Sequence, residues 1–165
     1  MTEEAWTTKK VYLAAPFFNR EQLDIVEQIE DVFDAAPRDL FELYSPRHDG
    51  VLMEMSPEER KANSRRIYDN NVNNVFDAQM MVAVIDGKDA GTVFEMGCAF
   101  AKHIPIVAYS NEKKAVNIML RHSCIAVVRS PLMLKFLLRD WRNTESLDWA
   151  AKATDYQKWD EENVT

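Results

Sequence analysis

The chain has 165 residues, of which 47% are hydrophobic, and its formal net charge is −7. This length suits one well-filled core and is too short for two ordinary domains, so we expect a single domain over residues 1–165. The acidic balance disfavours nucleic acid as a partner, because binding to phosphate backbones depends on lysine and arginine. No apolar run approaches the ~20 residues that span a bilayer, and the polar start lacks the pattern of a secretory signal. We therefore expect a cytoplasmic protein that does not bind membranes.

The first elements alternate between strand and helix patterns. Lys10–Ala15 is apolar and β-rich, as expected of a strand buried in a parallel sheet. Asn19 can cap a helix that runs to about Ala36, because apolar residues recur there at spacings of three and four. Leu40–Tyr44 is a second short apolar run and predicts the next strand.

A capping box marks the start of the second helix. Ser56 is followed by Pro57, which suits the first helical position, and by Glu59, which can bond back to the cap. We expect this helix to continue to about Asp77. It leads into Met80–Ile85, which predicts the third strand.

The second half of the chain repeats the alternation. We expect a helix over about Thr92–Lys102 and a shorter one over roughly Ala115–Leu120. Two further apolar runs, Ile104–Tyr109 and Cys124–Val128, predict the last two strands. The pattern makes no clear prediction for residues 131–139.

Five strands with intervening helices predict an α/β fold, in which a doubly wound, flavodoxin-like parallel sheet carries helices on both faces. In such sheets, ligands bind in the crevice outside the carboxyl ends of the strands. We therefore expect the site in the loops that follow the strands. These loops are residues 15–18, 45–50, 86–91 and 109–112.

Three carboxylates follow the third predicted strand. Asp86 comes directly after it, Asp89 lies in the loop, and Glu95 falls in about the first turn of the next helix, on its inward face. The partial positive charge of a helix N-terminus favours an anion, so we expect Glu95 to be ionised and able to act as a nucleophile. On spacing alone, a simpler interpretation is that Glu95 balances the helix dipole and Asp89 caps the helix.

Two carboxylates flanking one crevice are what glycosidic bond chemistry requires. One attacks the anomeric carbon while the other serves the leaving group, and for net retention they lie roughly 5 Å apart. Either Asp89 or Asp86 is the candidate partner of Glu95. We also expect Asp86 to contact the substrate.

Asn71 is a further candidate, because it belongs to the stripe of the second predicted helix that faces the sheet. Its amide could bind a base or a sugar, or make an internal hydrogen bond. The sequence has no glycine-rich dinucleotide loop and no metal-ligand spacing among its three histidines, so we expect neither a metal nor an organic cofactor.

Two stretches resemble the nucleoside 2-deoxyribosyltransferase family. Val11–Phe18 is similar to the family's first strand and turn, and Asp89–Ala99 is similar to its D-x-G-x-x-x-E-x-G-x-A signature. The resemblance implies that Glu95 is the nucleophile and that Tyr12 holds it in place. It also implies that Asp89 contacts the base or the sugar.

The resemblance extends to substrate contacts and assembly. Phe17, in the first turn, is expected to contact the substrate. Asn117 and Met119 form an element similar to the family's N-x-M, in which the asparagine reaches a neighbouring subunit's site and contacts the deoxyribose. The active unit would then be a homo-oligomer built from dimers, up to a hexamer.

Two departures from the family matter. Asn71 stands where several bacterial members carry an aspartate that helps protonate the departing base, so this role falls to Asp89 here. Short bacterial members also end on a tyrosine whose terminal carboxylate enters the site. This chain runs past Tyr156 to Thr165, so we do not carry that contact over, and the sequence after Trp149 shows no clear pattern.

The predicted activity is transfer of 2-deoxyribose from a 2′-deoxynucleoside to a free nucleobase through an ester on Glu95, as in nucleoside salvage. A related alternative is hydrolysis of 2′-deoxynucleoside 5′-monophosphates, for which Ser45, Arg47 and Arg20 are available as phosphate ligands. Another is a silent module that binds nucleosides without turnover. A receiver domain phosphorylated on Asp86 is disfavoured, because the first strand lacks the acidic pair that holds magnesium.

Overall fold

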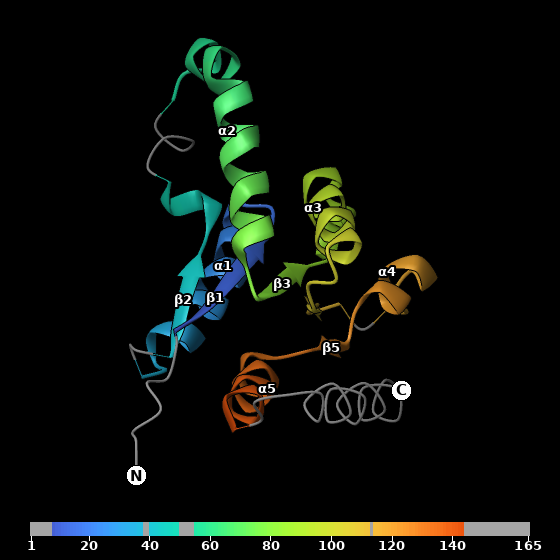
Figure 1. The fold of residues 1–165 in the computed structure, drawn as a ribbon. Helices are drawn as coiled ribbons and strands as arrows, with labels where there is room; N and C mark the ends of the chain where they lie inside the picture. The colour runs from blue at the N-terminus through green and yellow to red at the C-terminus, as the bar shows by residue number, and fades with distance from the viewer. Residues whose placement is uncertain (1–7, 38–39, 50–54, 113, 144–165) are drawn as a thin grey trace.

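Five parallel strands in the order β2-β1-β3-β4-β5 form the centre of the molecule, with helices on both faces (Figure 1). The structure is a computed structural model that describes residues 8–37, 40–49, 55–112 and 114–143. The strands are β1 (Lys9–Ala14), β2 (Phe41–Tyr44), β3 (Met80–Val84), β4 (Ile106–Tyr109) and β5 (Ala126–Val128). The predicted fold class is confirmed, and all five predicted strands are present.

The first two helices begin where their caps predict. The helix α1 (Arg20–Asp34) starts after Asn19, whose side chain accepts a hydrogen bond from the Gln22 backbone amide at 2.9 Å. The helix α2 (Pro57–Asp77) starts with the predicted capping box, in which Ser56 and Glu59 bond to each other's backbone amides at 3.2 and 2.8 Å. Each cap satisfies amides that the helix itself leaves unpaired.

The later helices depart from the predicted ranges. The helix α3 (Ala90–Ala101) begins before Thr92, because Asp89 caps it. The helix α4 (Ile118–Ser123) starts later than predicted, because Asn117 caps it and accepts from a backbone amide of the first turn. A fifth helix, α5 (Pro131–Asn143), occupies the stretch for which the sequence pattern made no clear prediction.

The core consists of two layers, one on each face of the sheet. In β1, Val11 and Leu13 point to one face while Tyr12 and Ala14 point to the other, as the pleat of a strand requires. The first face packs against α1 and α5, and the second against α2 and α3. Glu95, on α3, therefore shares the second layer with Tyr12.

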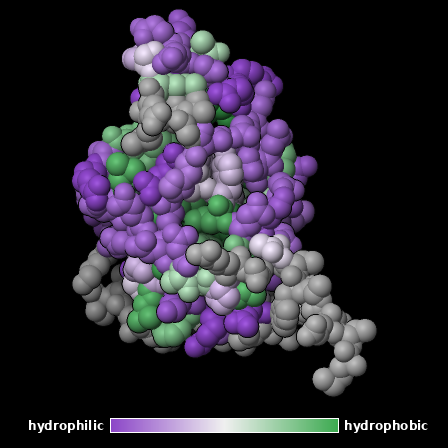
Figure 2. All heavy atoms as spheres, turned by 90° about the vertical axis from the view of Figure 1, so that its left-hand side faces the viewer, coloured by the Kyte–Doolittle hydropathy of each residue, from purple (hydrophilic) through white to green (hydrophobic). Residues whose placement is uncertain are grey.

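The face of the molecule shown in Figure 2 is mainly hydrophilic, with apolar residues gathered in small patches. This distribution follows from the two core layers, which take up most of the large apolar side chains of the sheet. Among the described residues, none of the helices is long and apolar enough to cross a membrane.

Candidate active site

A cavity of about 470 Å³ opens at the carboxyl end of the sheet. The loops after β1 and β2, the inner face of α2 and the start of α3 line it, so it lies where the fold predicts a ligand crevice. The lining side chains are Ala15, Phe17, Phe18, Leu23, Pro46, Arg60, Ile67, Asn71, Asp89, Gly91 and Glu95. This volume falls in the range of small-molecule sites.

Glu95 reaches the cavity from α3 and is held by Tyr12. The buried Tyr12 hydroxyl donates to Glu95 Oε1 at 2.6 Å, across 83 residues of sequence. Burial, and then the charge of Glu95, raise the pKa of the Tyr12 phenol, so this group stays protonated and remains a donor. Oxygen Oε2 of Glu95 has no partner among the described residues, which leaves it available to a ligand.

The ionisation of Glu95 differs from the prediction. Burial raises the pKa of Glu95 to about 7, the Tyr12 hydrogen bond opposes this, and the charge of Asp89 adds to it. Because α3 begins at Ala90, Glu95 lies in the second turn, beyond the free amides of the helix N-terminus. The expectation of a carboxylate kept ionised by the helix start is therefore corrected: desolvation dominates.

Asp89 combines the two roles that its spacing left open. Its Oδ2 accepts hydrogen bonds from the Thr92 amide at 2.8 Å and the Thr92 hydroxyl at 3.1 Å, so it caps α3. It also lines the cavity beside Glu95. A Cβ on Gly91 would lie 3.1 Å from Asp89 Oδ2, so the glycine leaves room for the carboxylate to fold back onto its cap.

Asn71 lines the cavity and also meets a neighbouring tyrosine. Its Oδ1 lies 3.4 Å from the Tyr44 hydroxyl, which is 3.1 Å from Asp49 Oδ2 and accepts from Asn70 Nδ2 at 2.9 Å. With Oδ1 turned to Tyr44, the Asn71 amide group is the donor left for the cavity. Both predicted uses of Asn71, internal bond and ligand contact, are compatible with this position.

Tyr44 is a site residue that the sequence analysis missed. Its ring stacks on that of Tyr12 with centroids 5.5 Å apart and 22° between planes. The two rings come from neighbouring strands at paired positions, so the stack supports the phenol that holds Glu95. The available signal was a tyrosine in each of the first two predicted strands.

The predicted contact residue Phe17 lines the cavity with a second aromatic ring. Phe17 and Phe18 stack with centroids 5.3 Å apart, and Leu23 and Ile67 add aliphatic surface. Such a wall suits a planar nucleobase, which gains from stacking as well as from burial. The cavity thus places an apolar wall near two carboxylates.

Three predicted site residues lie outside this cavity. Asp86 lines a different one, of about 440 Å³, beside the start of α1. Its carboxylate accepts from the Ser110 hydroxyl at 2.5 Å and the Asn111 amide at 2.8 Å, which ties the ends of β3 and β4 together. Asn117 and Met119 lie at the exposed start of α4, where Met119 is 76% exposed.

The predicted phosphate ligands are already paired or buried. Arg47 Nε lies 2.9 and 3.0 Å from the two carboxylate oxygens of Glu30, and Arg20 pairs with Asp24 at 2.6 Å. Ser45 is buried. In the described residues no group of three or more His, Cys, Asp and Glu side chains is placed to hold a metal ion.

Comparison with known proteins agrees with this geometry. A model of the family described as nucleoside 2-deoxyribosyltransferase matches residues 11–148. The chain belongs to this family. The family resemblance is thereby confirmed, and the protein is an enzyme of this family.

Three solved structures show the same architecture. A 2-deoxyribosyltransferase from Bacillus psychrosaccharolyticus is 30% identical, with a TM-score of 0.63 over 76% of this chain and 90% of that one. A conserved protein from Enterococcus faecalis V583 is 24% identical (TM-score 0.65, coverage 81% and 99%), and a CMP N-glycosidase from Clostridium botulinum is 17% identical (0.51, 81% and 99%). The latter two share the fold alone. No curated protein matches the chain.

Proposed function

We propose that this family member transfers 2-deoxyribose from a 2′-deoxynucleoside to another nucleobase, with Glu95 as the nucleophile. The observation that carries the proposal is the Tyr12–Glu95 pair, 2.6 Å apart, at the wall of a cavity with an aromatic side. The bond fixes one carboxylate oxygen and leaves the other free to attack a sugar carbon. The 2-deoxyribosyltransferase of Bacillus psychrosaccharolyticus supports the same class of substrate.

The reaction proceeds by two displacements. In the first, a Glu95 oxygen bonds to C1′ while the bond from C1′ to the base nitrogen breaks, and the base leaves with the electron pair and takes a proton. Asp89, when protonated, is the carboxyl group in the cavity that can deliver this proton. In the second, an incoming base attacks C1′ and releases the Glu95 carboxylate, the N–H proton of that base returns to Asp89, and the two displacements give net retention.

The absence of a 2′-hydroxyl favours this route. The transition state resembles an oxocarbenium ion, and an electron-withdrawing oxygen on the neighbouring carbon would destabilise it. Ribonucleosides are therefore expected to react more slowly than 2′-deoxynucleosides.

The proposed substrates are free nucleosides rather than 5′-monophosphates. Arg47 and Arg20, the arginines expected to bind phosphate, are engaged by Glu30 and Asp24. Arg60 is the cation that lines the cavity. The N-glycosidase relative shares the fold, so hydrolysis of a nucleotide is the alternative that the experiment must separate.

A second copy of the chain completes the site in this proposal. Asn117 and Met119 lie outside the cavity of their own chain, and neighbouring exposed side chains make the surface of α3 and α4 apolar. These side chains are Val93, Phe94, Phe100, Ile118 and Met119. A surface of this kind is typical of a protein interface, so we expect the protein to form a homo-oligomer. We also propose that it is a cytoplasmic enzyme of nucleoside salvage.

The test incubates the protein with thymidine and adenine and follows 2′-deoxyadenosine by chromatography. Formation of deoxyadenosine by the wild type, and its loss in Glu95→Ala, supports the proposal. Near-normal exchange by Glu95→Ala overturns the role of Glu95. Thymine with free deoxyribose and no deoxyadenosine identifies a hydrolase.

If thymidine is not consumed, the same assay with purine donors and with deoxynucleoside monophosphates follows. Release of deoxyribose phosphate would identify the monophosphate hydrolase. Nucleoside binding by calorimetry without turnover of any donor would identify a binding module.

A further inference from the structure

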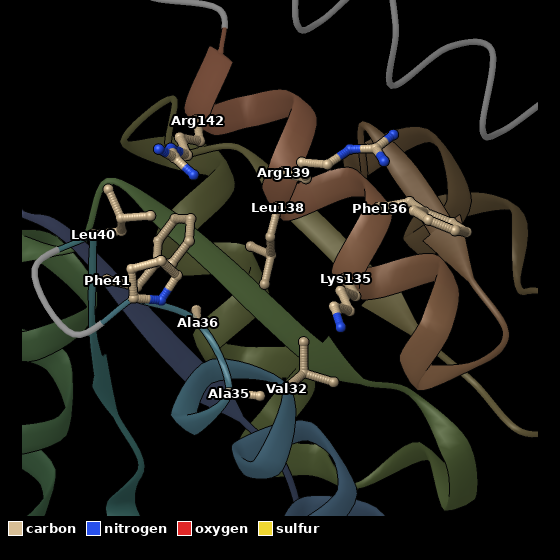
Figure 3. A pocket seen from close by; sticks show the side chains of 11 residues that line it. Val32, Ala35, Ala36, Leu40, Phe41, Lys135, Phe136, Leu138, Arg139 and Arg142 are labelled. Carbon is tan, nitrogen blue, oxygen red and sulfur yellow. The ribbon is translucent and has the colours of Figure 1, made fainter.

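Another cavity, distinct from those lined by Glu95 and Asp86, lies on the opposite face of the sheet from Glu95. It is formed between the end of α1 and the outer half of α5. Its volume is about 190 Å³. In Figure 3, Leu138 and Lys135 point from α5 toward Val32 and Ala35 of α1. Leu40 and Phe41, at the start of β2, close one side. The floor of this cavity is thus apolar. The elements that form it, α1, β2 and α5, pack together elsewhere in the core.

Three cations surround this apolar floor. Lys135, Arg139 and Arg142 all line the cavity from α5. Arg139 lies over the Phe136 ring and 3.5 Å from Asp140, whereas Lys135 and Arg142 have no partner among the described residues. The cavity therefore combines an apolar floor with two cations, Lys135 and Arg142, that have no partner among the described residues. Such a cavity complements an aromatic side chain flanked by carboxylates.

The chain itself supplies such a group directly after α5. Residues 144–165, which lie outside the described part of the structure, contain six acidic residues against two lysines. Their first aromatic residue is Trp149, with Asp148 and Glu145 just before it. The family match ends at residue 148, so most of this segment lies outside the matched residues.

The geometry allows the segment to fold back. Arg142, which lines the cavity, stands next to the last residue of α5, Asn143. Five residues lie between Asn143 and Trp149, and the six residue steps span at most about 20 Å when extended. The part of α5 that lines the cavity, from Lys135 to Arg142, is about 10 Å long. Trp149 can therefore reverse direction and still reach the floor.

We infer that the segment 144–165 docks on its own chain, with Trp149 in the cavity between α1 and α5 and its neighbouring acids paired with Lys135 and Arg142. The indole removes apolar surface from water at the half-buried Val32 and Phe41. The carboxylates satisfy two cations that the described fold leaves unpaired. Docking thus fastens α5 to α1 without touching the active site.

The test uses the full chain labelled with 5-fluorotryptophan, and Trp149→Phe assigns the fluorine signal of Trp149. We expect that signal to show the small solvent isotope shift of a buried indole. In the double variant Lys135→Glu/Arg142→Glu it is expected to move to the exposed position, and amide exchange over residues 144–152 to speed up about tenfold. These side chains are exposed, so the fold itself should be retained.

Two matched variants make the result specific. Lys61→Glu/Arg66→Glu, on the exposed face of α2, changes the net charge equally and is expected to leave the signal in place. Adding Glu145→Lys/Asp148→Lys to the cavity variant reverses both partners and should restore burial. A fully exposed Trp149 in the wild type, or a signal unchanged in the cavity variant, overturns the inference. Protection that disappears on dilution also overturns it, because the segment would then come from a second copy.

Discussion

Asp86 and Glu95 lie on either side of the turn that joins β3 to α3, and their carboxylates have contrasting surroundings. Asp86 accepts from the Ser110 hydroxyl through one oxygen and from the Asn111 amide through the other. Among the described residues, Glu95 accepts from Tyr12 alone and faces a largely apolar cavity. A carboxylate bonded by fixed donors at both oxygens serves the fold, whereas one with a free, poorly hydrated oxygen is available for chemistry.

The largest expected difference is in turnover. Glu95→Gln should lower kcat for base exchange by at least about 1,000-fold, because an amide is not a nucleophile. The glutamine oxygen still accepts from Tyr12, so the geometry is kept. Deoxyadenosine formation from thymidine and adenine measures the effect. A variant that keeps roughly a tenth of the wild-type rate would show that the ester does not form on this residue.

The Tyr12 bond sets the pH dependence of the reactive carboxylate. Glu95 must be ionised to attack, so kcat/KM should rise with pH until about 7 and then level off. Tyr12→Phe removes the hydrogen bond that lowers the pKa of Glu95, so the rise should move to higher pH. At pH 7 we expect a loss of about 10- to 100-fold. Initial rates between pH 5 and 9 test this, and an unmoved acid limb would contradict it.

The same burial makes stability depend on pH. Glu95 ionises near 4.5 in an unfolded chain and near 7 in the folded protein, so stability falls as pH rises between these values and the loss persists above them. Glu95→Gln cannot ionise and should exceed the wild type by about 2 kcal/mol at pH 8, with little difference near pH 4. Urea unfolding at both pH values measures this. Equal stabilities at pH 8 would mean that Glu95 is well solvated.

Replacing the acid by its amide at Asp86, on the other side of the turn, should lower stability and leave turnover nearly unchanged. Asp86→Asn replaces one acceptor by a donor, so the carboxylate's bond from either the Ser110 hydroxyl or the Asn111 amide is lost. We expect the free energy of unfolding to fall by about 1 to 2 kcal/mol and kcat to stay within about threefold of the wild type. Thermal unfolding and the exchange assay provide the two readouts. A loss of activity as large as that of Glu95→Gln would place Asp86 in the reaction.

Local signals explain what the sequence predicted correctly. The five strands follow from apolar runs, and the starts of α1 and α2 from Asn19 and Ser56, whose side chains bond to amides a few residues away. The start of α3 was predicted two residues too late, near Thr92, because Asp89 caps the helix and Ala90 is its first residue. That shift places Glu95 in the second turn, where desolvation rather than the helix dipole determines its pKa.

Contacts between distant segments explain the rest. The stack of Tyr44 on Tyr12 depends on the pairing of β2 with β1, and the burial of Glu95 depends on how α2 and α3 close over the sheet. The sequence of α5 also contains a local signal for a helix. Its buried residues Leu134, Leu137, Leu138 and Trp141 recur at helical spacing, and Ser130 caps the helix by accepting from the Met133 amide at 3.2 Å.

The reacting groups and the α2 wall of the cavity belong to different elements, and this separation has a practical consequence for enzyme engineering. Tyr12 comes from β1 and Glu95 from α3, whereas the wall contributed by α2 consists of Arg60, Ile67 and Asn71. A library restricted to these three positions would vary the accepted nucleobases while leaving the reacting groups on separate, unaltered elements. The helix α2 is thus the natural place to broaden or redirect the substrate range of this scaffold.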